Sequence, residues 1–157
     1  MDWSTLLFSF QGRINRCKYW LAALIYIGAW FVFTAAALIW LGGIDFDQLF
    51  RFAGGALLIW LVAVVLFVAG TWSAFATGVK RLHDRDKSGW WMLLFWFGPS
   101  LGGGSGSAMG DSSANVLLSL IGAVIAIWAF VELGCLRGTT GPNQYGPDPL
   151  QTPAAAY

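Results

Sequence analysis

Charged residues are scarce in this sequence. Lysine, arginine, aspartate and glutamate make up 11% of its 157 residues, whereas a soluble domain carries about 25%. Hydrophobic residues make up 57%. So few charges cannot cover the surface of a soluble protein of this size, because the remaining apolar side chains would face water. The composition therefore excludes an ordinary soluble domain and predicts a single domain whose solvent is lipid.

Cysteine and histidine are also scarce, which limits the chemistry. The two cysteines, Cys17 and Cys135, are too few for a disulfide framework. With His83 they could supply three zinc ligands, but no C-x-x-C spacing supports such a site. A phosphate loop is missing, and the basic residues are too scattered to indicate nucleic acid. We therefore expect no metal, no cofactor and no nucleic-acid partner.

Long apolar runs, the last of which contains one acid, Glu132, dominate the rest of the sequence. A helix needs about 20 apolar residues to cross the hydrocarbon core of a bilayer, and residues 19–41, 54–77 and 116–136 are long enough. In lipid each segment must satisfy its own backbone hydrogen bonds, which predicts helices rather than strands. The first run is longer than the apolar region of a signal peptide, so we expect it to remain as an anchor. The predicted fold class is an all-α integral membrane protein, a small polytopic helical bundle.

A fourth hydrophobic segment, at residues 90–107, is shorter. Its apolar part ends at Leu101, and about 12 helical residues cover only about 18 Å. Pro99 follows Gly98, and a stretch rich in glycine and serine begins at Gly102. The segment is either a kinked crossing or a re-entrant half-span; we predict the kinked crossing, because the basic residues favour an even number of crossings. A G-x-S-G match at residues 103–106 falls on the opposite predicted membrane face from the only histidine and is interpreted as a linker.

Basic residues gather on one side of the predicted spans. Eight of the nine lie there: Arg13, Arg16, Lys18, Lys80, Arg81, Arg85, Lys87 and Arg137. The other side has Arg51, with Asp45, Asp47 and Asp111. Basic loops stay in the cytoplasm, so the sequence predicts a multi-pass protein with both termini cytoplasmic. A three-crossing topology, which moves only Arg137 and the tail outside, is the alternative.

The two ends of the chain differ from the spans. Four apolar residues near the N-terminus recur at the spacing of one helical face: Trp3, Leu6, Leu7 and Phe10. This pattern predicts a short amphipathic helix lying on the membrane surface; the alternative is a frayed terminus. Residues 150–157 carry no packing signal, and we expect them to form a disordered tail. The single membrane domain then covers residues 1–149.

Three polar segments flank the hydrophobic runs. They read, in order, FQGRINRCKYW at residues 10–20, GVKRLHDRDKSGWW at 78–91 and ELGCLRGTTGPNQYGPDPL at 132–150. Together they resemble the bacterial inner-membrane family catalogued as domain of unknown function 805, and the resemblance covers nearly the whole chain. The middle segment is the most specific of the three. The resemblance implies a location in the bacterial inner membrane and marks the positions of the motifs, but it implies no reaction.

The predicted topology brings these polar segments to the cytoplasmic face. Their side chains form the candidate binding cluster: Arg13, Arg16, Arg81, His83, Asp84, Lys87, Glu132, Asn143, Tyr145 and Asp148. The cluster either closes the cytoplasmic face of the fold or binds a ligand or partner. We expect the chain after the last span to fold back. Either Asp148 or Glu132 is then expected to pair with an arginine at position 13, 16 or 81.

The favoured function is a non-enzymatic membrane module that binds anionic lipid, another membrane protein or a second copy of itself. An oligomeric small transporter or channel is one alternative, although such a protein is expected to carry polar residues at the midplane of the membrane, where this sequence has almost none. An enzyme acting on lipid head groups is another. It would need a paired acid and base, and His83 with Asp84 or Asp148 is the only candidate set.

Overall fold

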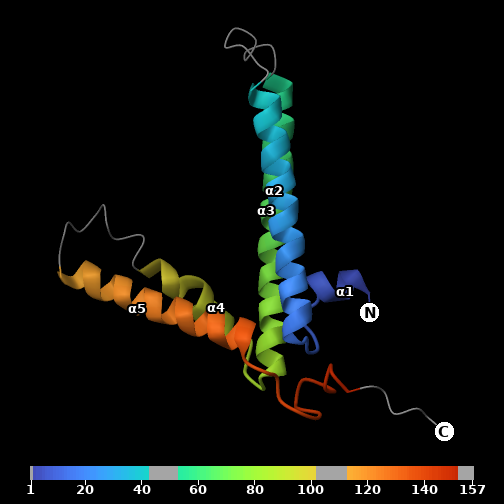
Figure 1. Ribbon diagram of the computed structural model, residues 1–157, viewed down its shortest axis with the longest axis vertical. Coiled ribbons are helices and arrows are strands. Elements are labelled where there is room, and N and C mark those ends of the chain that lie inside the picture. The colour runs from blue at the N-terminus through green and yellow to red at the C-terminus, as the bar shows by residue number, and fades with distance from the viewer. Residues whose placement is uncertain (1, 43–52, 102–112, 152–157) are drawn as a thin grey trace.

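Helices make up most of the computed structural model, which describes residues 2–42, 53–101 and 113–151 (Figure 1). The elements follow in this order: α1 (Trp3–Phe8), α2 (Arg16–Gly42), α3 (Ala53–Asp84), α4 (Trp91–Phe97), the 3-10 turn η2 (Gly98–Leu101), α5 (Ser113–Phe130) and the π-helical turn η3 (Val131–Cys135). Within these ranges no strand occurs. The all-α fold class predicted from the sequence is confirmed.

Three of the described helices have the length and composition of membrane spans. They are Arg16–Ile39, Leu57–Asp84 and Ser113–Cys135, and Trp91–Leu101 is a shorter apolar helix. Their outer faces carry large apolar side chains such as Phe31, 75% exposed, which water would not tolerate in such number. The three long apolar helices and the single short one agree with the sequence prediction. Residues 102–107 of the predicted third segment, with the G-x-S-G match, lie outside the described residues, as do residues 152–157 of the predicted tail.

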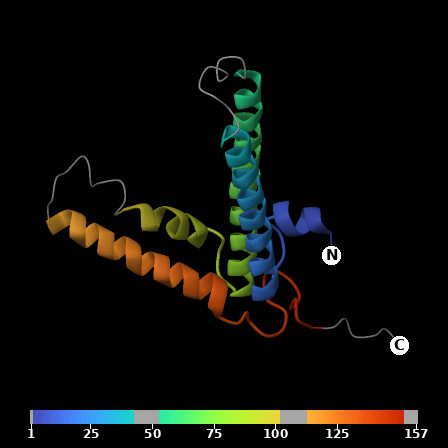
Figure 2. The same cartoon turned by 45° about the horizontal axis from the view of Figure 1, so that its top comes forward.

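Two helical hairpins meet at one end of the molecule. Helices α2 and α3 form a long antiparallel pair, while α4 and α5 lie side by side and leave that pair at a steep angle (Figures 1 and 2). Helix α1 lies against α3 on the other side of the long pair. The C-terminal segment then runs beneath α2 and α3. We call this junction, where α2 begins at Arg16 and α3 ends at Asp84, the charged end.

Small residues allow the second hairpin to close. A Cβ atom on Gly122 of α5 would lie 3.0 Å from the carbonyl oxygen of Pro99, and one on Gly98 would lie 2.6 Å from Cγ2 of Ile125. Larger side chains at these positions would push η2 away from α5. Helix α4 changes to 3-10 geometry at the Gly98–Pro99 pair, because proline lacks the N–H that would continue the α-helical ladder. The sequence predicted a kink at this pair.

A small buried core joins the two hairpins at the charged end. Leu82 of α3, Met92 and Phe95 of α4, and Leu133 of η3 are buried together. A Cβ atom on Gly78 would lie 2.5 Å from Sδ of Met92, so the glycine makes room for α4 against α3. Leu82 and Leu133 follow Arg81 and Glu132 in the chain, so the packing of this core sets the distances between the elements that carry the polar side chains of the charged end.

Helix α3 ends in a Schellman motif, which turns the chain toward α4. The N–H of Lys87 donates to the carbonyl of Leu82 at 2.9 Å, and the N–H of Asp86 donates to the carbonyl of His83 at 3.0 Å. Asp86 holds the left-handed position of the motif with φ of 56°. The helix therefore continues seven residues beyond the predicted hydrophobic run, which ends at residue 77, and reaches Asp84.

Helix α1 is held against α3 by a buried lysine. Lys80 Nζ donates to the carbonyl oxygens of Thr5 at 2.7 Å and Leu6 at 2.5 Å, and Leu6 is buried. The last carbonyls of a helix have no partner within it and carry its negative dipole end, so an ammonium group is the matching donor. The predicted N-terminal helix is present, and its apolar face is partly used inside the protein. Its position at the membrane surface stays a prediction.

Lys80→Met is expected to release α1 while leaving the rest of the fold in place. The change removes two charge-assisted hydrogen bonds to the last carbonyls of α1, each contributing about 1.5–3 kcal/mol. Hydrogen–deuterium exchange of residues 3–8 in detergent micelles should accelerate about tenfold or more. Exchange of residues 113–130 is the internal control and should not change. Equal protection of α1 in the variant and the wild type would contradict this assignment.

Candidate functional site

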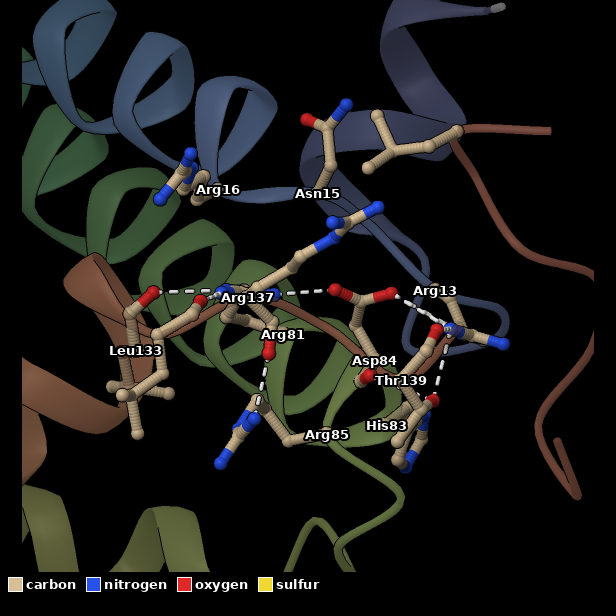
Figure 3. Close-up of polar contacts among 12 residues, drawn as sticks. Arg13, Asn15, Arg16, Arg81, His83, Asp84, Arg85, Leu133, Arg137 and Thr139 are labelled. Atoms are coloured by element: carbon tan, nitrogen blue, oxygen red, sulfur yellow. Dashed lines mark hydrogen bonds and ion pairs between the residues drawn. The ribbon is translucent and has the colours of Figure 1, made fainter. Parts of the chain in front are cut away.

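Asp84 is the centre of a buried ion network at the charged end (Figure 3). Its Oδ1 accepts hydrogen bonds from Arg13 Nη2 at 3.1 Å and Arg13 Nε at 3.2 Å. Its Oδ2 accepts from Arg81 Nη1, one helical turn earlier on α3. The side chains of Arg13, Arg81 and Asp84 are 1%, 0% and 3% exposed. Two arginines therefore share one carboxylate in the interior of the fold.

Backbone carbonyls satisfy the other N–H groups of Arg13, which lies just before α2. This guanidinium donates to the carbonyl oxygens of Thr139 at 2.7 Å, Gly141 at 2.8 Å and Gly146 at 3.2 Å. Burying a charge is costly unless all of its hydrogen bonds are made. The network thus depends on the C-terminal segment as much as on Asp84, and it confirms that the chain after the last span folds back.

The π-helical turn η3 supplies further carbonyl acceptors. Its widened geometry is marked by the bond from the N–H of Leu136 to the carbonyl of Val131 at 3.1 Å. Three side chains donate to the carbonyls at this end: Arg81 to Leu133 and Leu136, Trp20 to Gly134, and Arg16 to Cys135. Cations at the C-terminal end of a helix oppose its negative dipole end. The turn therefore anchors the end of the last span to α2 and α3.

Glu132 forms a second ion-pair group with the segment after α3. Its Oε1 lies 3.0 Å from Arg85 Nε and 2.9 Å from Lys87 Nζ, and its side chain is 4% exposed. The one acid within the last apolar run is thereby neutralised. The sequence prediction named Arg13, Arg16 or Arg81 as the partner, and that pairing is wrong. Asp84 takes the arginines at 13 and 81 because it lies one helical turn from Arg81.

The sequence predicted an arginine partner for Asp148 or Glu132, but Asp148 instead accepts backbone hydrogen bonds that hold the C-terminal turn. Its Oδ2 accepts the N–H of Gly141 at 3.0 Å and its Oδ1 accepts the N–H of Leu150 at 2.9 Å. The N–H groups of Leu150 and Gly141 lower the pKa of Asp148 below its ordinary value of 3.8. The charged carboxylate is the form that accepts both bonds. Its contribution to the folded turn is therefore complete above the ordinary pKa and is lost as the pH falls through the lowered value.

His83 stacks on Tyr145 of the C-terminal segment. The two ring centroids are 3.9 Å apart and the ring planes differ by 4°. His83 Nδ1 lies 3.3 Å from the carbonyl oxygen of Gly12, and since a carbonyl only accepts, Nδ1 carries the proton. The carboxylates of Asp84 and Asp148 are engaged elsewhere. The acid–base pair that an enzyme would need is therefore not formed by these groups.

Asn143 fixes the turn that carries Tyr145. Its Nδ2 donates to the carbonyl of His83 at 2.9 Å, and its Oδ1 accepts the N–H of Tyr145 at 2.9 Å. Asn143 and Gly146 also exchange two backbone hydrogen bonds of 3.1 Å. Gly146 has φ of 132°, a conformation that side chains rarely allow. The turn is thus tied to the end of α3 by a side-chain amide as well as by the ring stack.

A small polar pocket opens beside the ion network. It has a volume of about 190 Å³ and is lined by Asn15, Arg16, Asp84, Arg137, Gly138 and Leu150. Asn15 Oδ1 accepts the N–H of Lys18 at 2.9 Å and so caps the start of α2. Within the described residues, no ion pair joins Arg16 or Arg137 to a carboxylate. Figure 3 shows both arginines and Asn15 on the same side of Asp84.

The ten candidate residues therefore lie in one region, but in distinct groups. Several contributing residues were not predicted: Asn15, Lys80, Arg85, Arg137 and Thr139. All five lie within the three polar segments, and Lys80, Arg85 and Arg137 could have been added from the basic residues counted there. Asn15 and Thr139 bond through backbone groups, which the sequence does not display. No three histidine, cysteine or acidic side chains of the described ranges lie where they could hold a metal ion, and Cys17 and Cys135 are both exposed and unpaired with each other.

Comparison with known proteins assigns the chain to a family. The family model described as "Protein of unknown function (DUF805)" matches residues 7–147. The chain belongs to the DUF805 family. The match includes nearly all of the three polar segments that form the charged end, so the network around Asp84 lies within the DUF805 region of the chain. No solved structure matches the chain.

Relatives of this DUF805 chain occur in Escherichia coli strain K12. Inner membrane protein YhaH is 31% identical over an alignment of 157 positions that covers 98% of this chain and all of the relative. Uncharacterized protein YiiR is 34% identical over 142 residues, or 90% of this chain and 86% of the relative. Inner membrane protein YhaI is 29% identical over 140 residues, or 89% and 85%. Together with the apolar helices, these similarities indicate that the DUF805 chain is a protein of the bacterial inner membrane.

Proposed function

We propose that this DUF805 protein is a non-enzymatic, multi-pass membrane module that binds the phosphate group of an anionic lipid at the charged end. The charged end then lies at the cytoplasmic face, with both termini on that side. Eight of the nine basic residues gather there, and basic segments are retained in the cytoplasm. The proposed orientation thus places the charged end beside the anionic head groups of the inner leaflet.

A surplus of positive charge supports an anionic ligand. The eight basic side chains on the side of the charged end outnumber the five acidic ones there, Asp2, Asp84, Asp86, Glu132 and Asp148, by three. The buried trio of Arg13, Arg81 and Asp84 itself has a net charge of +1. The carboxylate in the pocket wall is therefore already compensated, and it does not cancel the attraction of the neighbouring arginines for an anion.

The observation that carries the proposal is the pair of arginines at the 190 Å³ pocket. Arg16 and Arg137 line it from different elements, and neither forms an ion pair with a carboxylate among the described residues. A guanidinium matches a phosphate with two parallel hydrogen bonds. The pocket also adjoins the start of the 27-residue helix α2, whose dipole favours a negative charge there. A phosphodiester is the head group that these features fit together.

Replacing both arginines tests this function. The purified protein in nanodiscs of mixed phosphatidylglycerol and phosphatidylcholine should retain phosphatidylglycerol preferentially, as measured by native mass spectrometry. Arg16→Gln with Arg137→Gln should weaken that preference about tenfold, because two charged hydrogen-bond donors to the phosphate are lost. Arg51→Gln, which removes a charge from the connection between α2 and α3, is the matched control and should change nothing.

Three further results test whether the pocket binds a lipid phosphate. Glycerol phosphate at millimolar concentration tests for a soluble phosphate ligand and should not displace the lipid, since it lacks the acyl chains that enter the bilayer. If the double variant keeps the wild-type preference for phosphatidylglycerol, the pocket does not bind the head group and the proposed function is wrong. An equal loss of preference in Arg51→Gln would also contradict the proposed function.

A further inference from the structure

A second and larger crevice is lined by His83 and Tyr145. It has a volume of about 480 Å³ and opens between α3, α4 and the C-terminal turn. The lining is mostly apolar or aromatic, with polar groups at one end: Phe10, Phe75, Val79, His83, Ser88, Gly89, Trp90, Met92, Leu93 and Tyr145. Sites for small molecules have volumes of about 300–1,000 Å³ and combine an apolar wall with a few polar groups.

From this crevice we infer a binding site for a neutral lipid, namely a fatty acyl chain that carries an uncharged head with hydroxyl groups, as in a monoacylglycerol. The apolar part of the crevice lies along Phe75 of α3 and Leu93 of α4, two helices that are apolar enough to lie in hydrocarbon. Its polar part lies at His83, Ser88 and Tyr145, next to the charged end. The crevice is therefore amphipathic in the same direction as a lipid in the proposed orientation.

The charge of the lining excludes an ionic head group. Among the described residues, no lysine, arginine, aspartate or glutamate lines this crevice, whereas two arginines line the 190 Å³ pocket. A phosphate would need a cation, and an ammonium group would need a carboxylate, because an unpaired charge is costly outside water. The two cavities thus differ in the head group that they fit, and the neutral site does not rest on the phosphate site.

The orientation of His83 determines which hydroxyl atom it would contact. Nδ1 faces the carbonyl oxygen of Gly12 and carries the proton, so Nε2 of the neutral ring is an acceptor. Stacking on Tyr145 holds the ring in this orientation. A Cβ atom on Gly89 would lie 2.8 Å from Cγ1 of Val79 and 3.6 Å from Nε2 of His83, so the absence of a side chain at residue 89 leaves this part of the crevice open. A hydroxyl group donating to Nε2 is the matching ligand group.

Competition among three ligands with the same chain tests the head-group specificity. A monoacylglycerol with a photoreactive diazirine in its acyl chain is crosslinked to the purified full-length protein in detergent. Mass spectrometry should locate crosslinks at residues 75 and 93. Monooleoylglycerol should compete about tenfold better than methyl oleate, which has no hydroxyl to donate, and better than oleoyl lysophosphatidylglycerol, whose head is anionic. Equal competition by methyl oleate or by the anionic lipid would overturn the inference.

Variants at His83 test the acceptor itself. His83→Phe keeps an aromatic ring against Tyr145 but has no acceptor nitrogen, so monooleoylglycerol and methyl oleate should become equal competitors. His83→Gln retains an acceptor oxygen at a similar distance from the backbone and should keep part of the difference. A preference for monooleoylglycerol that is unchanged in His83→Phe would refute the role of Nε2. Should the variants fail to fold, the comparison of three ligands on the wild type still decides the head group.

A pair of tryptophan substitutions tests where the acyl chain of the lipid binds. Leu93 lines the crevice and Leu94 does not, although they are 42% and 38% exposed on the same helix. Leu93→Trp should fill the crevice and reduce crosslinking about tenfold, whereas Leu94→Trp should leave it unchanged. The double variant Arg16→Gln with Arg137→Gln should also leave it unchanged. Equal effects of the two tryptophans on crosslinking would mean that the acyl chain lies on the outer surface of the helices and not in the crevice.

Discussion

Asp84→Asn is expected to lower the free energy of unfolding by about 3–5 kcal/mol. The change keeps the size of the side chain but leaves Arg13 and Arg81 buried with no negative charge between them. The new amide also directs N–H groups toward guanidinium N–H groups, which cannot bond to each other. Denaturation in mixed detergent micelles measures the loss, and the thermal midpoint in detergent should fall with it.

Asp86→Asn is the matched control for that experiment. Asp86 lies two residues further along, is exposed, and has a left-handed backbone conformation that asparagine also tolerates. Its stability change should stay within about 0.5 kcal/mol, as for other surface positions. Equal losses in the two variants would show that the arginines respond to net charge alone, and the buried network would then not be what holds the charged end together.

Gly138→Ala is expected to destabilise the protein by about 3 kcal/mol, near the upper end for an added methyl group in a packed site. The new Cβ atom would lie 2.0 Å from Oδ2 of Asp84 and 2.7 Å from Oδ1. That carboxylate is held on both sides by Arg13 and Arg81, so it cannot move aside without breaking the network. The C-terminal segment would have to lift away from α3 instead.

Gly28→Ala is the control with the opposite expected sign. No neighbouring atom of the described residues lies within 4 Å of a Cβ at position 28 on α2, and alanine is favoured over glycine within a helix by about 1 kcal/mol.

A double-mutant cycle locates the strain in Gly138→Ala. Asp84→Ala removes the carboxylate that a methyl group at residue 138 would meet. The double variant should therefore lose clearly less stability than the sum of the losses in Gly138→Ala and Asp84→Ala. Additive losses in this double-mutant cycle would place the strain elsewhere.

Much of the fold could be predicted because lipid imposes a simple requirement on the chain. Uninterrupted apolar runs must become helices in hydrocarbon, and three long apolar helices and a short one are present in the described structure. The shared location of the polar segments could also be predicted, since basic residues are kept to one end of the spans. Neither inference needed the packing of individual side chains.

The partners within the charged end could not be predicted because they depend on where α3 stops. The hydrophobic run ends at residue 77, yet the helix continues to Asp84, and only this extension brings Asp84 to the same face as Arg81. The helix ends at a left-handed Asp86, a position where glycine is the usual signal. Hydropathy predicts the length of a span in lipid, but it gives no information about helical residues that continue beyond the span.

Backbone acceptors were the other feature beyond prediction. Arg13 and Arg81 donate to carbonyls of Thr139, Gly141, Gly146, Leu133 and Leu136. Every residue has a backbone carbonyl group, so the residue types do not indicate which carbonyls accept hydrogen bonds from the arginines. The π-helical turn that presents two of them, the carbonyls of Leu133 and Leu136, has no sequence signature of its own in residues 131–135.

The division of the Asp84 network among distant parts of the chain bears on how the protein is made. A ribosome releases Arg13 first, then Arg81 and Asp84, and the carbonyls of residues 133–146 last. While the first two spans are entering the membrane, the guanidinium groups have only water as a partner for most of their donors. The α2–α3 hairpin therefore stays hydrated at its base until translation is nearly over. Completion of the C-terminal turn converts two solvated cations into interior ones, so a truncated product differs from a finished one in the charge that it exposes.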